Sequence, residues 1–193
     1  MNPEDLWVAI FRGIPRAGKT TLAKALHHTL EDKYRIALIH YDNIFEMSIG
    51  EEKKRLKPKI AMGIIKDLLI EDFNLILDYS FVFTQDLKQT IQLIEKYALR
   101  YQIYLLKPSF LEIIERDKRF SAPKGIETLK KFWAAMENNT FSEGLEIDTG
   151  RLSIDECIEF ILNNMWSNGL WHCQSKGNKL LTANHLLGIK KKC

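Results

Sequence analysis

A lysine and two threonines directly follow a glycine-rich turn near the start of the chain, in the stretch LWVAIFRGIPRAGKTTLAKALHHTL. Residues 13–20, GIPRAGKT, match the pattern Gly-x4-Gly-Lys-Ser/Thr, whose backbone N–H groups converge on phosphate oxygens. The pattern requires an apolar strand before it and a helix after it, and the flanking residues have that character. The stretch therefore predicts a loop that binds the phosphates of a nucleotide. The alternative is a tight turn with a solvated lysine.

The residues of this loop have separate expected roles. Lys19 reaches the β- and γ-phosphate oxygens, Thr20 supplies a hydroxyl ligand to Mg²⁺, and Thr21 adds a phosphate contact. Arg16 is either a further phosphate contact or an exposed loop arginine. The residues expected to bind the nucleotide are Gly13, Ile14, Pro15, Arg16, Ala17, Gly18, Lys19, Thr20 and Thr21.

Apolar runs of strand length alternate with segments of helical spacing along the chain. The expected strands are residues 7–11, 36–40, 75–77, 101–106 and 145–147, and the expected helices are residues 20–30, 60–70, 84–98, 110–118, 126–138 and 153–165. The strand runs show little polar alternation, which is typical of strands buried on both faces. The alternation predicts an α/β layer with a mainly parallel sheet and right-handed crossovers. Ser153 and Glu156 form a predicted capping box before the last helix.

Composition restricts the class of protein. The chain has 193 residues, 46% of them apolar, which suits one domain with a sizeable core. No apolar run approaches the length of a membrane helix and the start lacks a signal peptide, so we expect a cytoplasmic protein without integral membrane association. Residues 1–165 are close to neutral, whereas residues 166–193 contain lysines and no acid. We therefore expect a main domain over 1–165 and a basic extension over 166–193.

Missing motifs restrict the kind of nucleotide enzyme. The sequence has no guanine-reading Asn-Lys-x-Asp or Thr-Lys-x-Asp tetrad and no Leu-Ser-Gly-Gly-Gln stretch, and it is short for an ABC or AAA+ module. A small phosphotransferase remains.

The order of five motifs then resembles the P-loop kinase family that includes polynucleotide 5′-kinases, chloramphenicol phosphotransferase and zeta-toxin-like kinases. The motifs are GIPRAGKTTLA, IHYDNIF, LILDYS, PSFLEIIERDKRF and EIDTGRLSIDECIEFI, and together they span about residues 6–165. The resemblance implies a three-layer α/β P-loop NTPase fold with a five-stranded, mainly parallel sheet of order 2-3-1-4-5 and a small helical lid. It also implies ATP and Mg²⁺ as cofactors.

The same resemblance implies roles for two aspartates that follow strands. Asp42 occupies the position of the base that accepts the proton of the acceptor hydroxyl, although it or Asn43 could instead cap the next helix. Asp78 occupies the position of the carboxylate that holds Mg²⁺ through water beside Thr20, although it could instead pair with a turn.

Two lid arginines and one threonine complete the implied site. Arg116 and Arg119 would close over the triphosphate and offset charge in the transfer, together with Lys19. The alternative is a solvated charged stretch with local ion pairs. The segment after Ile147, including Thr149, should lie near the adenine.

The acceptor side departs from the family. Polynucleotide-kinase-like members often read Asp-Asp-Thr-Asn at the end of the third strand, whereas this chain reads DYSFVF, which argues against a nucleic-acid 5′-end. Four aromatic residues could form a wall for a small aromatic or nucleoside-like acceptor, or could belong to the core: Phe45, Tyr79, Phe81 and Phe83.

The sequence thus predicts a kinase that transfers the γ-phosphate of ATP to a hydroxyl of a small molecule, a nucleotide or a nucleic-acid end. The alternative is a non-catalytic ATP-binding module whose basic extension recruits a partner.

Overall fold

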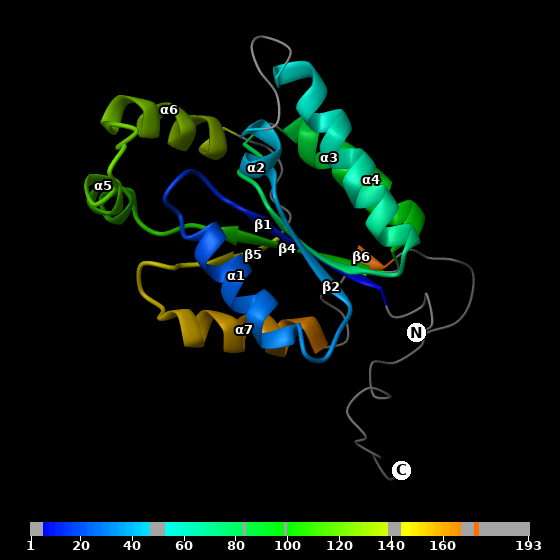
Figure 1. Cartoon of the computed structure of the whole chain (residues 1–193). Helices are drawn as coiled ribbons and strands as arrows, with labels where there is room; N and C mark the ends of the chain where they lie inside the picture. The colour runs from blue at the N-terminus through cyan, green and yellow to red at the C-terminus, as the bar shows by residue number, and fades with distance from the viewer. Residues whose placement is uncertain are drawn as a thin grey trace.

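A parallel sheet lies between two layers of helices (Figure 1). The computed structural model describes residues 6–46, 53–82, 84–98, 100–138, 144–166 and 172–173, with the backbone alone at 45–46, 53–58, 166 and 172–173. The parallel strands are β1 Trp7–Arg12, β2 Ile36–His40, β3 Asn74–Asp78, β4 Arg100–Leu106 and β5 Leu145–Ile147. Their order, β2-β3-β1-β4-β5, confirms the order expected from the sequence.

The central strand shows why these segments read as unbroken apolar runs. Val8 and Ile10 of β1 pack into a core that includes side chains of α3 (Lys53–Ile70) and α4 (Thr84–Tyr97). Ala9 and Phe11, the alternate residues, pack into a second core with α1 (Lys19–Leu30) and α7 (Ile154–Trp166). Because successive side chains point to opposite faces, a strand covered on both sides must be apolar throughout.

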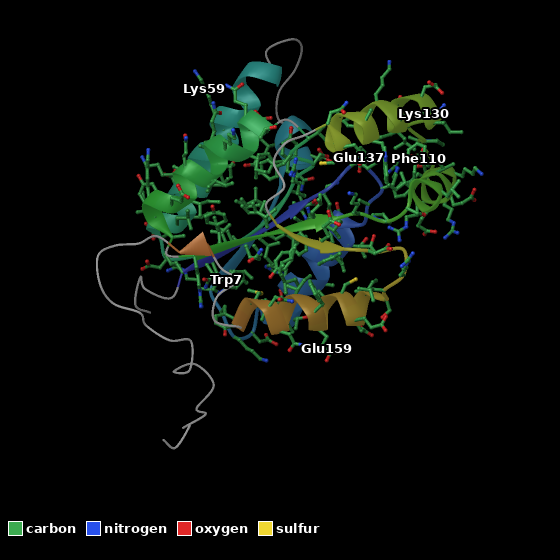
Figure 2. All side chains as sticks on the ribbon, turned by 180° about the vertical axis from the view of Figure 1, so that it is seen from behind. Trp7, Lys59, Phe110, Lys130, Glu137 and Glu159 are labelled. Carbon is green, nitrogen blue, oxygen red and sulfur yellow. The ribbon has the colours of Figure 1, made fainter. Side chains whose placement is uncertain are left out.

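Two further helices, which we call the lid after the sequence expectation, lie beside the carboxyl ends of the strands. They are α5 Phe110–Lys118 and α6 Ile126–Glu137. Figure 2 shows Phe110 and Lys130 of these helices at one end of the molecule, with Trp7 of β1 toward the other end. Ile113 and Leu129 form a small core of the lid, and Ile14 from the loop after β1 is buried with them. The phosphate-loop segment is therefore packed directly against the lid.

Some boundaries differ from the predictions. Helix α2, Tyr41–Glu46, follows β2 without a gap and was not among the expected helical segments, and α3 begins at Lys53 instead of residue 60. Charged residues at the start of α3 hide the apolar spacing that marks its second half. The capping box before α7 is confirmed, because Ser153 N–H donates to Glu156 Oε2 at 2.8 Å and Glu156 N–H donates to Ser153 Oγ at 3.3 Å.

A short strand, β6 His172–Cys173, pairs antiparallel with the start of β4. Its two residues come from the predicted basic extension, and residues 167–171 and 174–193 lie outside the described part of the chain. Over the ranges that are described, no helix is both long and apolar enough to span a membrane.

Candidate nucleotide and acceptor site

One cleft of about 840 Å³ gathers most of the predicted site residues at the carboxyl ends of the parallel strands. The predicted residues that line it are Pro15, Arg16, Gly18, Lys19, Thr20, Thr21, Asp42, Asp78, Arg116, Arg119 and Thr149. Open α/β sheets bind ligands at this edge.

The other predicted loop residues, Gly13, Ile14 and Ala17, are buried instead of lining the cleft. A Cβ on Gly13 would lie 2.8 Å from the carbonyl oxygen of Leu106, so the close approach of the loop to β4 requires glycine there. These three residues hold the loop in place, and its remaining residues face the ligand space.

Lys19 lies at the start of α1, where the positive end of the helix dipole points into the cleft. Gly18 caps the helix in the left-handed region at φ 95°. The ammonium group of Lys19 donates to the carbonyl oxygen of Ile14 at 3.1 Å. Burial lowers the pKa of Lys19 to about 8, against the opposing influence of Asp78 and Asp42. An anion placed beside Lys19 would favour its charged form.

Asp78, at the end of β3, accepts two hydrogen bonds at the same oxygen. Thr20 Oγ1 donates to Asp78 Oδ2 at 2.7 Å, and His40 Nδ1 lies 2.7 Å from that oxygen. Asp78 is buried, with 7% of its surface exposed. The predicted neighbours Thr20 and Asp78 are therefore in direct contact, and His40 joins them.

Asp42 lies in the first turn of α2, exposed, and lines the same cleft as Asp78. Because α2 begins at Tyr41, Asp42 is inside the helix and is not the residue that precedes it.

Hydroxyl and carboxylate oxygens are the ligands that Mg²⁺ prefers, so Thr20 with Asp78 suits this ion. In the described part of the chain, no group of three or more His, Cys, Asp or Glu residues is arranged to hold a metal. Magnesium in nucleotide sites is commonly held by one or two protein ligands together with phosphates.

The two lid arginines have different surroundings. Arg116 Nε donates to Glu112 Oε1 at 2.9 Å, and its Nη1 donates to Thr149 Oγ1 at 3.1 Å and to the carbonyl oxygen of Arg16 at 3.3 Å. Thr149 Oγ1 donates in turn to the carbonyl oxygen of Ala17 at 2.7 Å. Arg116 thus joins the lid, the loop after β5 and the phosphate loop.

Arg119 caps the end of α5, where the helix stops, and is exposed in the cleft. Arg116 is held by the protein backbone and Thr149, whereas Arg119 faces the ligand space.

Arg16 connects the phosphate loop to the lid. Its Nε pairs with Asp117 Oδ1 at 2.7 Å, and its guanidinium lies 3.5 Å from the ring centroid of Phe120. The hydrogen bond from Arg16, with backbone N–H groups of Lys124 and Gly125, lowers the pKa of Asp117 to about 2. Arg16 adopts φ 70°, a left-handed conformation that is costly for a side chain with a Cβ. Its contacts to the lid offset that cost.

Several residues that line the cleft were missed by the sequence reasoning. Lys124 contributes a positive charge that reaches Lys19. The others are apolar or a thiol: Leu22, Phe120, Phe132, Leu152, Ile154 and Cys157. Phe120, Leu152 and Ile154 are exposed, although apolar. The sequence carries no signal for them, because their exposure in the cleft is visible only in the folded chain.

Of the aromatic residues on the acceptor side, one lines the cleft and another belongs to the hydrophobic core. Tyr79 lines the cleft beside Ser80 and Val82, and its ring stacks on Tyr41 with centroids 4.5 Å apart. Phe81 is completely buried and belongs to the core. The side chain of Phe45, and Phe83, lie outside the described residues.

The comparisons with known proteins agree with the fold. No model of a protein family matches the sequence, and no curated protein matches it. Among solved structures, the chain is similar to the Mycobacterium tuberculosis APS kinase CysC in complex with AMPPNP and APS (TM-score 0.62, 14% identity, 84% of this chain and 98% of that one). It is also similar to a gluconokinase from Sinorhizobium meliloti 1021 (TM-score 0.59, 13% identity, 81% and 89%).

A further similar structure is the Pnkp1/Rnl/Hen1 RNA repair complex (TM-score 0.58, 16% identity), in which the match covers 68% of this chain and 44% of that chain. At these identities the likeness shows the fold. The chain therefore has the α/β fold of P-loop kinases, with a sheet of order 2-3-1-4-5 and its phosphate loop after the central strand.

Proposed function

We propose that this protein is an ATP- and Mg²⁺-dependent kinase that transfers the γ-phosphate of ATP to a hydroxyl group of a small molecule. The observation that carries the proposal is that one cleft is lined by Lys19, Thr20, Asp78 and Asp42 together, with Thr20 hydrogen-bonded to Asp78. Asp42, the exposed carboxylate in the first turn of α2, is the group in this cleft that supports catalysis over nucleotide binding alone.

The nucleotide half of the cleft supports ATP as the phosphate donor. The loop N–H groups, the start of α1 and Lys19 supply positive potential for the phosphates. The exposed apolar residues Phe120, Leu152 and Ile154 offer a surface for a flat base. The structure of the similar APS kinase was determined with AMPPNP, an ATP analogue.

Thr20 and Asp78 would hold the magnesium ion, directly and through water respectively. When bound, Mg²⁺ neutralises charge on the phosphate oxygens. Asp42 would accept the proton of the acceptor hydroxyl and orient it, since it is exposed in the cleft within electrostatic reach of Lys19. Arg119 and Lys124 would add positive charge over the transferred group.

The acceptor half supports a small molecule as the acceptor. Tyr79, Ser80 and Val82 give a short wall with one aromatic ring and two hydroxyls. The similar structures include kinases of small molecules and an RNA repair complex, so the test must include both kinds of acceptor.

The test is a screen with γ-³²P-labelled ATP and Mg²⁺ against a panel of hydroxyl compounds, including sugars, nucleosides, aminoglycosides and 5′-hydroxyl oligonucleotides. We expect one chemical class of small molecule to be labelled by the wild-type protein and not by Asp42→Asn. Asn43→Ala, which changes the exposed neighbour, is the matched control and should label normally. Tight ATP binding without any labelled product would favour the non-catalytic module.

A further inference from the structure

His40 lies beside the aspartate expected to hold the metal because of the register of two strands. In the parallel pair of β2 with β3, His40 is the partner of Asp78, and each is the last residue of its strand. Their side chains therefore leave the sheet at the same edge and on neighbouring strands. His40 is largely buried, with 17% of its side chain exposed.

The donor and the acceptor in the contact between His40 and Asp78 can be assigned. An ionised carboxylate can only accept hydrogen bonds, so the short distance of 2.7 Å makes His40 Nδ1 the donor and Asp78 Oδ2 the acceptor. Thr20 Oγ1 donates to the same oxygen at 2.7 Å. Neither of these bonds uses Oδ1. Two donors on one oxygen fix the rotation of the carboxylate and leave the other oxygen for a further partner.

We propose that His40 is a positioning residue for the magnesium site. By its hydrogen bond, His40 holds Asp78 in the orientation that the metal and its water require. The proposal rests on the proposed function, since it assigns the partner of a residue expected to hold the ion. Thr20 must serve both as a ligand of the metal and as a donor to Asp78. The contact of His40 Nδ1 with Asp78 would keep the carboxylate in place while Thr20 binds the ion. Groups that hydrogen-bond to metal-site residues affect metal affinity by roughly 10–100-fold.

Two substitutions of similar shape separate hydrogen bonding from packing. His40→Asn keeps an N–H donor near the position of Nδ1, whereas His40→Leu has a similar size and no donor. The exposed His28 of α1, which contacts Glu31, supplies the control His28→Leu. Thermal unfolding without Mg²⁺ shows whether each variant is folded.

The experiment measures the affinity of a fluorescent ATP analogue by titration, in excess EDTA and over a series of Mg²⁺ concentrations. We expect His40→Leu to need roughly tenfold more Mg²⁺ for half-maximal enhancement of binding, with its affinity in EDTA unchanged. His40→Asn should stay close to the wild type, and His28→Leu should match it.

Three results would overturn the assignment of His40. They are a normal Mg²⁺ requirement in His40→Leu, an equal loss in His40→Asn and His40→Leu, or a loss of affinity in His40→Leu that is the same in EDTA. A wild-type protein whose binding does not respond to Mg²⁺ would instead contradict the metal in the proposed function.

Discussion

The two halves of the cleft are built in different ways. The nucleotide half is made largely by one continuous segment, residues 13–21, whose backbone and helix start carry most of the expected binding. The acceptor half is made by separate residues after β2 and β3: Asp42, Tyr79, Ser80 and Val82. A loop that binds through its backbone N–H groups tolerates few changes of sequence. A surface made of separate side chains can be changed one residue at a time. In the proposed function, the first half would therefore determine the type of reaction, and the second would select the acceptor.

The halves also differ in their connections to the lid. Arg16, Arg116 and Thr149 link the phosphate loop to the lid and to the loop after β5 through several hydrogen bonds. On the acceptor side, the ring of Tyr79 stacks on Tyr41 and packs edge-on against Phe81. A movement of the lid should therefore affect nucleotide binding before it affects the acceptor side.

The largest expected effect comes from Lys19→Ala in the nucleotide half. The change removes the charge that would bridge the β- and γ-phosphates, so ATP binding should be sharply weakened and phosphoryl transfer abolished. Titration calorimetry and the labelled-product assay measure the two losses. Lys24→Ala, an exposed lysine of the same helix, should leave both unchanged. Full activity in folded Lys19→Ala would contradict the assignment of the phosphate loop.

Asp42→Asn should separate the contributions of the two halves, because it should lower turnover without lowering nucleotide affinity. The substitution removes the proposed base while keeping the size of the side chain, so turnover should fall by roughly 10²–10⁴-fold. The nucleotide affinity should change little, because the phosphate loop is untouched. Steady-state kinetics and calorimetry on one preparation measure both quantities. A parallel loss of Mg²⁺-ATP affinity would instead make Asp42 part of the nucleotide or metal site.

Much of the fold and of the nucleotide half could be predicted from the sequence, because the signals are local. The phosphate-loop pattern is continuous, and strands buried on both faces give unbroken apolar runs. The links between distant residues could not be predicted in this way. Arg16 meets Asp117 across 101 positions, and His40 meets Asp78 through strand register. Helical spacing gave the bounds of α5 correctly as residues 110–118. It could not show that Arg116 is hydrogen-bonded to Thr149 and the phosphate loop while Arg119 caps the helix.

The lid arginines should show smaller and distinct effects. Arg116→Ala removes hydrogen bonds that hold Thr149 and the phosphate loop, so nucleotide affinity should fall by roughly tenfold, as expected for charged hydrogen bonds. Arg119→Ala should leave affinity nearly unchanged and lower turnover by roughly 10-fold to 100-fold. Lys118 lies between the two arginines in sequence and pairs with Glu115, so Lys118→Ala is the control and should change neither affinity nor turnover. Equal behaviour of the two arginine variants would contradict the division of roles.

The smallest expected effect is a proton taken up by Lys19 when ATP binds. In the free protein, burial lowers the pKa of Lys19 to about 8, so above that pH the side chain is mostly neutral. Phosphate oxygens beside the ammonium group favour the charged form and raise its pKa in the complex. At about pH 7 Lys19 is mostly protonated in both states and takes up little. At about pH 9 it is mostly neutral when free and protonated when bound, so binding should take up close to one proton.

Calorimetry of ATP binding in two buffers with different ionisation enthalpies measures this uptake, because the buffer supplies the proton. Lys19→Arg is the decisive variant, since a guanidinium stays protonated at both pH values and should abolish the uptake at about pH 9. Lys24→Ala should retain it. The ATP affinity of the wild type should also weaken as the pH rises above about 8, and that of Lys19→Arg should not. An unchanged uptake in Lys19→Arg would assign the proton to another group and remove this link between the buried lysine and the nucleotide half of the cleft.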